Sequence, residues 1–129
     1  MAQRLSALAL LVRDYDEAIA YFVDTLGFVL AEDTALSPEK RWVRVTPPGG
    51  DGCALLLAKA SSETQAAAIG DQSGGRVFLF LETDDFDRDY QAYLAAGVDF
   101  IETPRNEAFG KVAVFRDLYG NKWDLIGRR

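Results

Sequence analysis

The chain has 129 residues and a formal net charge of −6, with 20 acidic and 14 basic residues. This length predicts a single domain, and the acidity argues against nucleic acid and anionic membranes as partners while permitting a cationic one. The sequence contains no histidine, so it lacks the commonest general base and the commonest transition-metal ligand.

Neither an internal disulfide nor a membrane segment is expected. Cys53 is the only cysteine, and we interpret it as a small core residue rather than a nucleophile. The apolar run between Arg4 and Arg13 has eight residues, which is too short for a secretory signal peptide. No stretch approaches the roughly 18 apolar residues of a membrane-spanning helix. The sequence therefore predicts a cytoplasmic protein with no membrane attachment.

The first half of the chain has the pattern of a sheet with one amphipathic helix. Residues 5–12 (LSALALLV) are almost continuously apolar, which is typical of a buried strand. Asp14 and Glu17 have the spacing of a capping box that opens a helix, and Gly27 is placed to end that helix. Three more strands and a short helix are predicted at 28–31, 41–46, 53–58 and 62–69.

The same order of elements starts again in the second half. Residues 71–75 (DQSGG) have the composition of a linker. A strand is then predicted at 76–82, a helix from Asp85 to Gly97, a strand at 98–103 and a pair of strands within 112–126. In the tight turn of that pair, Asp117 is expected to accept hydrogen bonds from its own backbone.

The two halves align on their helices. Asp85 follows Asp14 by 71 residues, whereas Gly97 follows Gly27 by 70. The sequence therefore predicts an internal duplication of a strand-helix-strand-strand-strand unit. The first unit is expected at 1–70 and the second at 76–129, within a single domain.

Two stretches carry a resemblance to a known family. The opening VRDYDEAIAYF with LGF (within 12–28) and the closing FRDLYGNKWDLI (115–126), together with the paired units, resemble the glyoxalase, bleomycin-resistance and extradiol dioxygenase superfamily, also called the vicinal oxygen chelate superfamily. The resemblance covers essentially the whole chain. It implies an α+β fold in which tandem βαβββ units form a curved sheet cleft with helices on the outer face. Such a cleft binds a small molecule and is commonly completed by dimerisation.

The resemblance also allows the metal site of this superfamily to be tested. In its metal enzymes, His, Gln or Glu side chains from four strands hold a divalent ion. The matching positions here are Ala7, Phe78, a residue near Leu55, and Asp124. A metal needs several converging donors, and only Asp124 is one, so we predict no usual metal site and no cofactor. An unconventional carboxylate site formed by Asp124 with Glu82 stays open.

Strand alternation predicts which side chains line the cleft. If Asp124 faces the cleft, alternate residues of strand 76–82 face it too. The strands at 41–46 and 112–117 occupy equivalent positions in the two units, and their alternate residues add to the lining. The loop at 104–110 supplies a candidate lid. The predicted ligand-binding residues are Trp42, Arg44, Phe78, Phe80, Glu82, Phe109, Phe115 and Asp124. Trp123 is next to Asp124, so its side chain is expected on the opposite face of the sheet, packed under a helix. Each aromatic residue could instead belong to the core, because a register slip of one residue exchanges the faces of a strand.

Three functions stay open. The first is a metal-free protein that binds a small, cationic or aromatic molecule in an apolar cleft, as the bleomycin-resistance members do. The second is a divergent lyase or dioxygenase acting on a small carbonyl or phenolic substrate, with Asp124 as the best catalytic candidate. The third is a regulatory or structural module. A homodimer is expected because two open sheets leave apolar edges.

Overall fold

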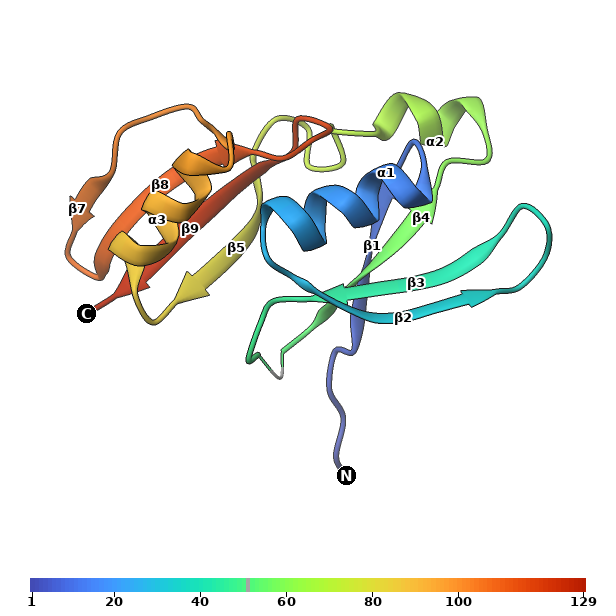
Figure 1. Ribbon diagram of the computed structural model, residues 1–129, viewed down its shortest axis with the longest axis horizontal. Coiled ribbons are helices and arrows are strands. Elements are labelled where there is room, and N and C mark those ends of the chain that lie inside the picture. Colours follow the sequence, from blue (N-terminus) through green and yellow to red (C-terminus); the bar gives the residue numbers. More distant parts are fainter. Residues whose placement is uncertain (51) are drawn as a thin grey trace. The chain divides into compact units, whose positions relative to one another are not determined.

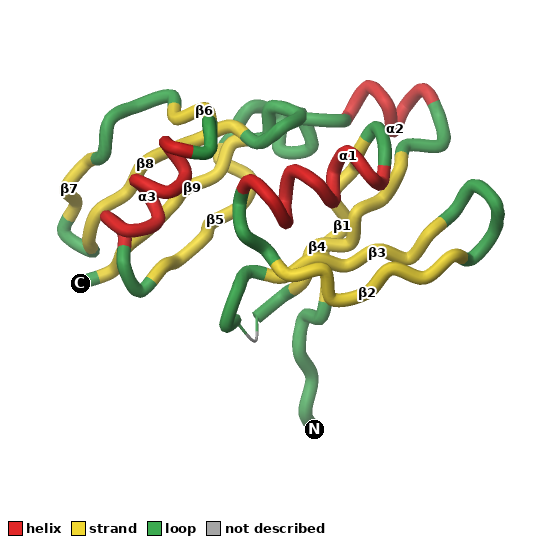
Figure 2. Tube along the Cα trace, in the orientation of Figure 1, coloured by secondary structure: helices red, strands yellow, loops and turns green. Residues whose placement is uncertain are grey.

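The computed structural model describes residues 1–50 and 52–129 (Figure 1). The chain forms two compact units, Met1–Ile69 and Gly70–Arg129. Each unit contains one curved sheet with a helix on one face (Figures 1 and 2), which confirms the predicted α+β fold. None of the helices in the described residues has the length and apolar character that crossing a membrane requires.

The first unit is a four-stranded sheet in the order β1-β4-β3-β2, in which β1 runs parallel to β4. Its elements are β1 (Ala7–Val12), α1 (Tyr15–Ala20), the π-helical turn η1 (Tyr21–Thr25), β2 (Val29–Ala35), β3 (Arg41–Thr46), β4 (Ala54–Lys59) and α2 (Glu63–Ala68). Asp14 caps α1 by accepting a hydrogen bond from the Glu17 amide at 2.9 Å, as the sequence predicts. The Glu17 carboxylate binds Arg13.

The two faces of the first sheet differ in character. One face packs under α1 and holds the buried alternate residues Leu10, Val12, Val43, Val45, Leu55 and Leu57. The opposite face, which we call the helix-free face of the first sheet, carries the cross-strand row Ala9, Leu56, Arg44 and Glu32. Trp42 lies on this face too, two residues before Arg44.

The second unit repeats the plan with one addition. Its strand order is β5-β9-β8-β6, and β7 pairs with β8. Its elements are β5 (Val77–Thr83), α3 (Phe86–Ala95), β6 (Asp99–Phe100), β7 (Arg105–Glu107), β8 (Gly110–Arg116) and β9 (Lys122–Arg128). The predicted strand at 98–103 is thus only two residues long.

The predicted loop at 104–110 is instead a β-hairpin, in which Arg105 pairs with Val112 and Glu107 with Gly110. Between β6 and β7 the ladder is interrupted, and the Glu102 carboxylate accepts the Val114 amide hydrogen at 3.1 Å. The side chain thereby supplies the acceptor that a continuous strand would have supplied. The sequence offered no sign of this, because β7 is short and polar.

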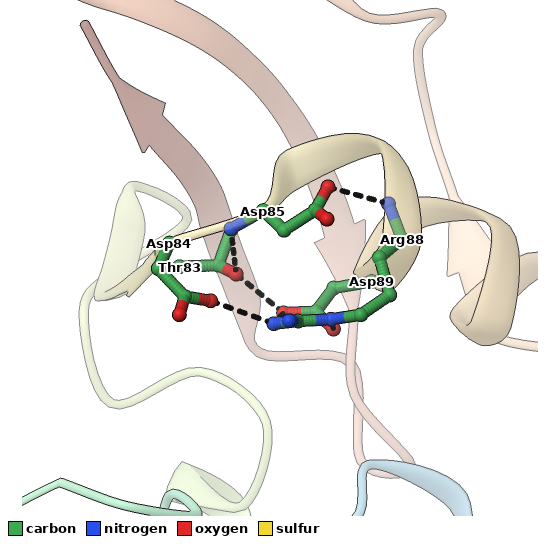
Figure 3. Close-up of polar contacts among 5 residues, drawn as sticks. All are labelled: Thr83, Asp84, Asp85, Arg88 and Asp89. Carbon is green, nitrogen blue, oxygen red and sulfur yellow. Dashed lines mark hydrogen bonds and ion pairs between the residues drawn. The ribbon is translucent and has the colours of Figure 1, made fainter.

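The start of α3 is fixed by a small polar network (Figure 3). Asp85 caps the helix by accepting from the Arg88 amide at 3.1 Å, and Thr83 accepts from the Asp85 amide at 3.0 Å. The Arg88 guanidinium binds Asp84 and Asp89 at 2.8 and 3.0 Å. Although burial alone raises the pKa of Asp89, its hydrogen bonds with Arg88 and Thr83 hold that pKa below its usual value. These contacts hold α3 over the sheet.

The turn between β8 and β9 is organised by the buried carboxylate of Asp117. It accepts from the backbone amides of Tyr119 and Asn121, and from the side chains of Asn121 and Trp123, each at 3.0 Å. This confirms the predicted turn chemistry and adds the indole bond. Because Trp123 is anchored on the helix side, its neighbour Asp124 must point to the opposite face.

Candidate functional site

The helix-free face of the second sheet carries four of the eight predicted ligand-binding residues. Phe80, Asp124 and Val114 form one cross-strand row on β5, β9 and β8. The Phe80 side chain is 64% exposed, whereas Val114 is buried. Glu82 lies two residues beyond Phe80 on the same face. Phe78 is half-buried and falls at a register irregularity in the pairing of β5 with β9.

Asp124 is the unusual group on this face. Its Oδ1 atom is buried and has no hydrogen-bond partner within residues 1–50 and 52–129. Burial raises the pKa of Asp124 above its usual value, while nearby Arg105 lowers it and Glu102 raises it. A carboxylate in this state is destabilised when ionised and gains from any donor or positive charge brought to it. Such a group is typical of a functional site.

Asp124 and Glu82, the two carboxylates considered for an unconventional metal site, both lie on this face. Within the described part of the chain, no three acidic or cysteine side chains come together as a metal-binding group. Glu82 forms an exposed ion pair with Arg128. In the first sheet, Leu56 occupies the position that Asp124 occupies in the second, because Ala9 pairs with Leu56 as Phe80 pairs with Asp124. Ala9, Leu56 and Phe80 offer no metal donor.

Phe115 lies on the opposite face from the one predicted. Its ring is fully buried under α3 and contacts Tyr93, Phe100 and Trp123 at centroid distances of 5.7, 5.6 and 5.7 Å. Trp123 is buried there too, as predicted. Phe115 is therefore a core residue, and the prediction that it lines the ligand site is wrong.

Phe109 occupies the tip of the β7–β8 hairpin rather than a free loop. Its side chain is 44% exposed, and the Arg128 guanidinium lies 5.9 Å from the centre of its ring. The Phe109 carbonyl also accepts from the Arg129 amide at 2.9 Å. These contacts tie Phe109 to the end of β9.

The helix-free face of the first sheet carries the other two predicted residues. The Trp42 side chain is 39% exposed, and Arg44 binds Glu32 at 3.0 Å. The Arg44 charge is therefore paired across neighbouring strands. Trp42 is left as the exposed aromatic surface of this face.

Trp42 also borders a pocket of about 620 Å³ that the sequence did not predict. The pocket lies where β3 begins and β4 ends, and residues of α1, the β2–β3 turn and the start of α2 also line it. Its lining includes Tyr15, Lys40, Arg41, Trp42, Leu56 and Lys59. Strand alternation assigns faces but does not show how turns close the end of a sheet, so the pocket had no clear sequence signal.

Arg41 is held rigidly at the rim of this pocket. Its guanidinium binds Asp33 at 2.7 Å and Asp16 at 2.9 Å, and it lies 5.2 Å from the centre of the Tyr15 ring. The hydrogen bond from Arg41 lowers the pKa of Asp33, and both acids raise that of Arg41. The positive charge of Arg41 is thus largely offset by its own partners.

Two βαβββ units of this kind define the glyoxalase fold. Residues 4–125 match the family model of the Glyoxalase/Bleomycin resistance protein/Dioxygenase superfamily, and the chain belongs to that superfamily. An uncharacterized protein of Shewanella frigidimarina (strain NCIMB 400) is 54% identical over 127 residues, which are 98% of this chain and 94% of the relative.

Solved structures agree with this assignment. UcmS2 is 32% identical, covers 98% of both chains and superposes with a TM-score of 0.83. TnmS3, an antibiotic binding protein from Streptomyces sp. CB03234, is 29% identical with a TM-score of 0.78, over 100% of this chain and 98% of TnmS3.

Proposed function

We propose that this protein binds a small aromatic molecule on the helix-free faces of its sheets, without the usual metal site of its superfamily. The observation that carries the proposal is the exposure of Trp42 and Phe80 on these faces. Exposed aromatic rings beside apolar strands are typical of binding surfaces. Antibiotic binding by the similar protein TnmS3 supports the same class of function.

The polar groups of the two faces would orient the ligand. Arg44 is neutralised by Glu32, whereas one oxygen of Asp124 lacks a partner within residues 1–50 and 52–129. An ammonium or N–H group of a ligand placed beside the Asp124 carboxylate would favour its ionised form. The second sheet therefore favours ligands that carry a donor or a positive charge.

A screen of aromatic antibiotics and aromatic amines tests the proposal. Thermal shift and tryptophan fluorescence should give saturable binding, and Trp42→Ala should weaken it by about 1–2 kcal/mol, or about five- to thirty-fold in Kd. Trp42→Phe is the matched control, because it keeps a stacking ring and should retain most of the affinity. A screen without hits, or hits indifferent to both Trp42→Ala and Phe80→Ala, would refute it.

The environment of Asp124 supports a second candidate function. In it the protein is an enzyme, and Asp124 transfers a proton to or from a small carbonyl or phenolic substrate. A raised pKa and an unpaired oxygen suit general acid–base chemistry. Elemental analysis tests the predicted lack of a metal, which both candidates share. We expect no stoichiometric Zn, Ni, Fe or Mn after desalting, and about one ion per chain would favour a metal enzyme instead.

A further inference from the structure

The pocket at the end of the first sheet has the size of a small-molecule site. Its volume of about 620 Å³ lies within the roughly 300–1,000 Å³ of typical ligand pockets. Trp42, Leu56 and Ala58 supply apolar lining from two neighbouring strands, and Tyr15 adds part of a buried ring. A planar hydrocarbon group would therefore find an apolar wall with an exposed indole beside it.

The lining of this pocket has more basic than acidic side chains, unlike the whole chain. The protein carries a net charge of −6, yet the lining holds three basic side chains and one acid, Lys40, Arg41, Lys59 and Glu39. Arg41 is offset by Asp33 and Asp16. The basic side chains of the lining that lack such partners are Lys40 and Lys59, which stand against one acid of the lining, Glu39.

The two lysines are the cations available to a ligand. Within residues 1–50 and 52–129, neither Lys40 nor Lys59 takes part in an ion pair. Lysine ammonium groups at the rim of a pocket attract anions over several ångströms, and the attraction weakens with added salt. A ligand cation would face these same charges and be repelled.

We propose that this pocket binds an aromatic anion, a planar compound whose ring lies against Trp42 and whose carboxylate or sulfonate is held by Lys40 and Lys59. The inference rests on the proposed function, because Trp42 is a binding residue in both. It specifies in addition that the ligand bound by the first unit carries a negative charge. The preference of Asp124 for positive charge belongs to the second unit and is a separate property.

Three probes of one shape test the inference by isothermal titration calorimetry: 2-naphthoate, 2-naphthamide and 2-naphthylmethylammonium. At low ionic strength, 2-naphthoate should bind the wild-type protein at least three-fold more tightly than 2-naphthamide. Lys40→Gln and Lys59→Gln should each weaken 2-naphthoate by about three- to ten-fold and leave 2-naphthamide unchanged. Lys111→Gln is the matched control, because Lys111 pairs with Asp87 in the second unit and its loss changes the net charge equally.

The outcomes separate the two proposals. The anion site would be overturned if 2-naphthoate bound no more tightly than 2-naphthamide. It would also be overturned if Lys111→Gln weakened 2-naphthoate as much as the pocket variants do. In either case, binding of 2-naphthamide that depends on Trp42 would leave the proposed function standing. Absence of saturable binding by all three probes would overturn the anion site, whereas the proposed function is decided by the screen of antibiotics and amines.

Discussion

Asp117 and Asp124 lie seven residues apart on one hairpin and meet opposite environments. The buried Asp117 carboxylate accepts four hydrogen bonds of 3.0 Å from three residues, so its charge is solvated by the protein. Asp124 keeps one buried oxygen without a partner in the described residues. The first arrangement stabilises the turn, whereas the second costs stability and leaves a group free to act on a ligand.

The raised pKa of Asp124 makes a prediction about stability and pH. An acid whose folded pKa lies above its unfolded value favours folding when protonated, so its ionisation costs stability as pH rises from the unfolded pKa through the folded one. Asp124→Asn removes this cost. The variant should be more stable than wild type at pH 7, and the difference should shrink as pH falls toward about 4, the ordinary aspartate range.

Urea unfolding of both proteins across this pH range measures the effect. Asp24→Asn, the same change at an exposed acid on η1, is the control. If Asp124→Asn lowers stability at pH 7 instead, Asp124 is a structural acid whose ionised form is favoured.

At the scale of single elements, hydrophobic patterns predicted helix starts and most strands, because caps and alternation are local. The faces of β8 were not predictable in this way. Helix starts repeat after 71 residues, but the glycines that end the helices repeat after 70, and β8 follows β3 by the same 70 residues. Leu55 pairs with Val45 in the first unit as Trp123 pairs with Phe115 in the second. Phe115 therefore corresponds to buried Val45, and matching it to Arg44 moved it to the wrong face.

Other elements were missed because their cause lies outside the local sequence. The β7 strand is short and polar, and it forms because β8 offers a partner. The π-helical turn η1 continues the apolar stripe of α1, so the pattern alone reads as one helix. The pocket at the end of the first sheet depends on the β2–β3 turn and α2, whose packing no alternation describes.

Gly110 shows how the β7–β8 hairpin depends on one position. It has φ of +145°, and a Cβ there would lie 2.0 Å from the Gly127 carbonyl oxygen. Gly110→Ala should therefore destabilise the protein by more than about 2 kcal/mol in urea unfolding. Gly74→Ala is the matched control, since Gly74 also has positive φ but no atom within 4 Å of its added Cβ, and it should cost about 1 kcal/mol. Equal losses would mean that the close approach of β8 and β9 at Gly110 does not hold.

At the scale of the whole molecule, acidity and local positive charge serve different ends. A net charge of −6 repels anions at long range. Lys40 and Lys59 at the pocket of the first unit carry the opposite charge, so their attraction for an anion must overcome the field of the whole chain. Added salt screens both effects, which is why low ionic strength is the sensitive condition for comparing charged probes.

The edges of the sheets predict association of two chains. β2 is an edge strand of the first sheet, and its first residues, Val29 and Leu30, are 50% and 40% exposed. Exposed apolar side chains on an edge strand favour pairing with another copy, and two-fold dimers are the commonest result. Light scattering at micromolar concentration should therefore give twice the chain mass of 14.2 kDa.

Substitution at this edge tests where the second copy binds. Leu30→Lys places a charge on the edge and should shift the protein toward the monomer. Leu118→Lys is the matched control, because Leu118 is 43% exposed but lies in the β8–β9 turn, and it should leave the mass unchanged. A wild-type mass of one chain would refute dimerisation. A dimer that tolerates Leu30→Lys would place the interface elsewhere, since a lysine cannot lose its water at an apolar contact without a large cost in free energy.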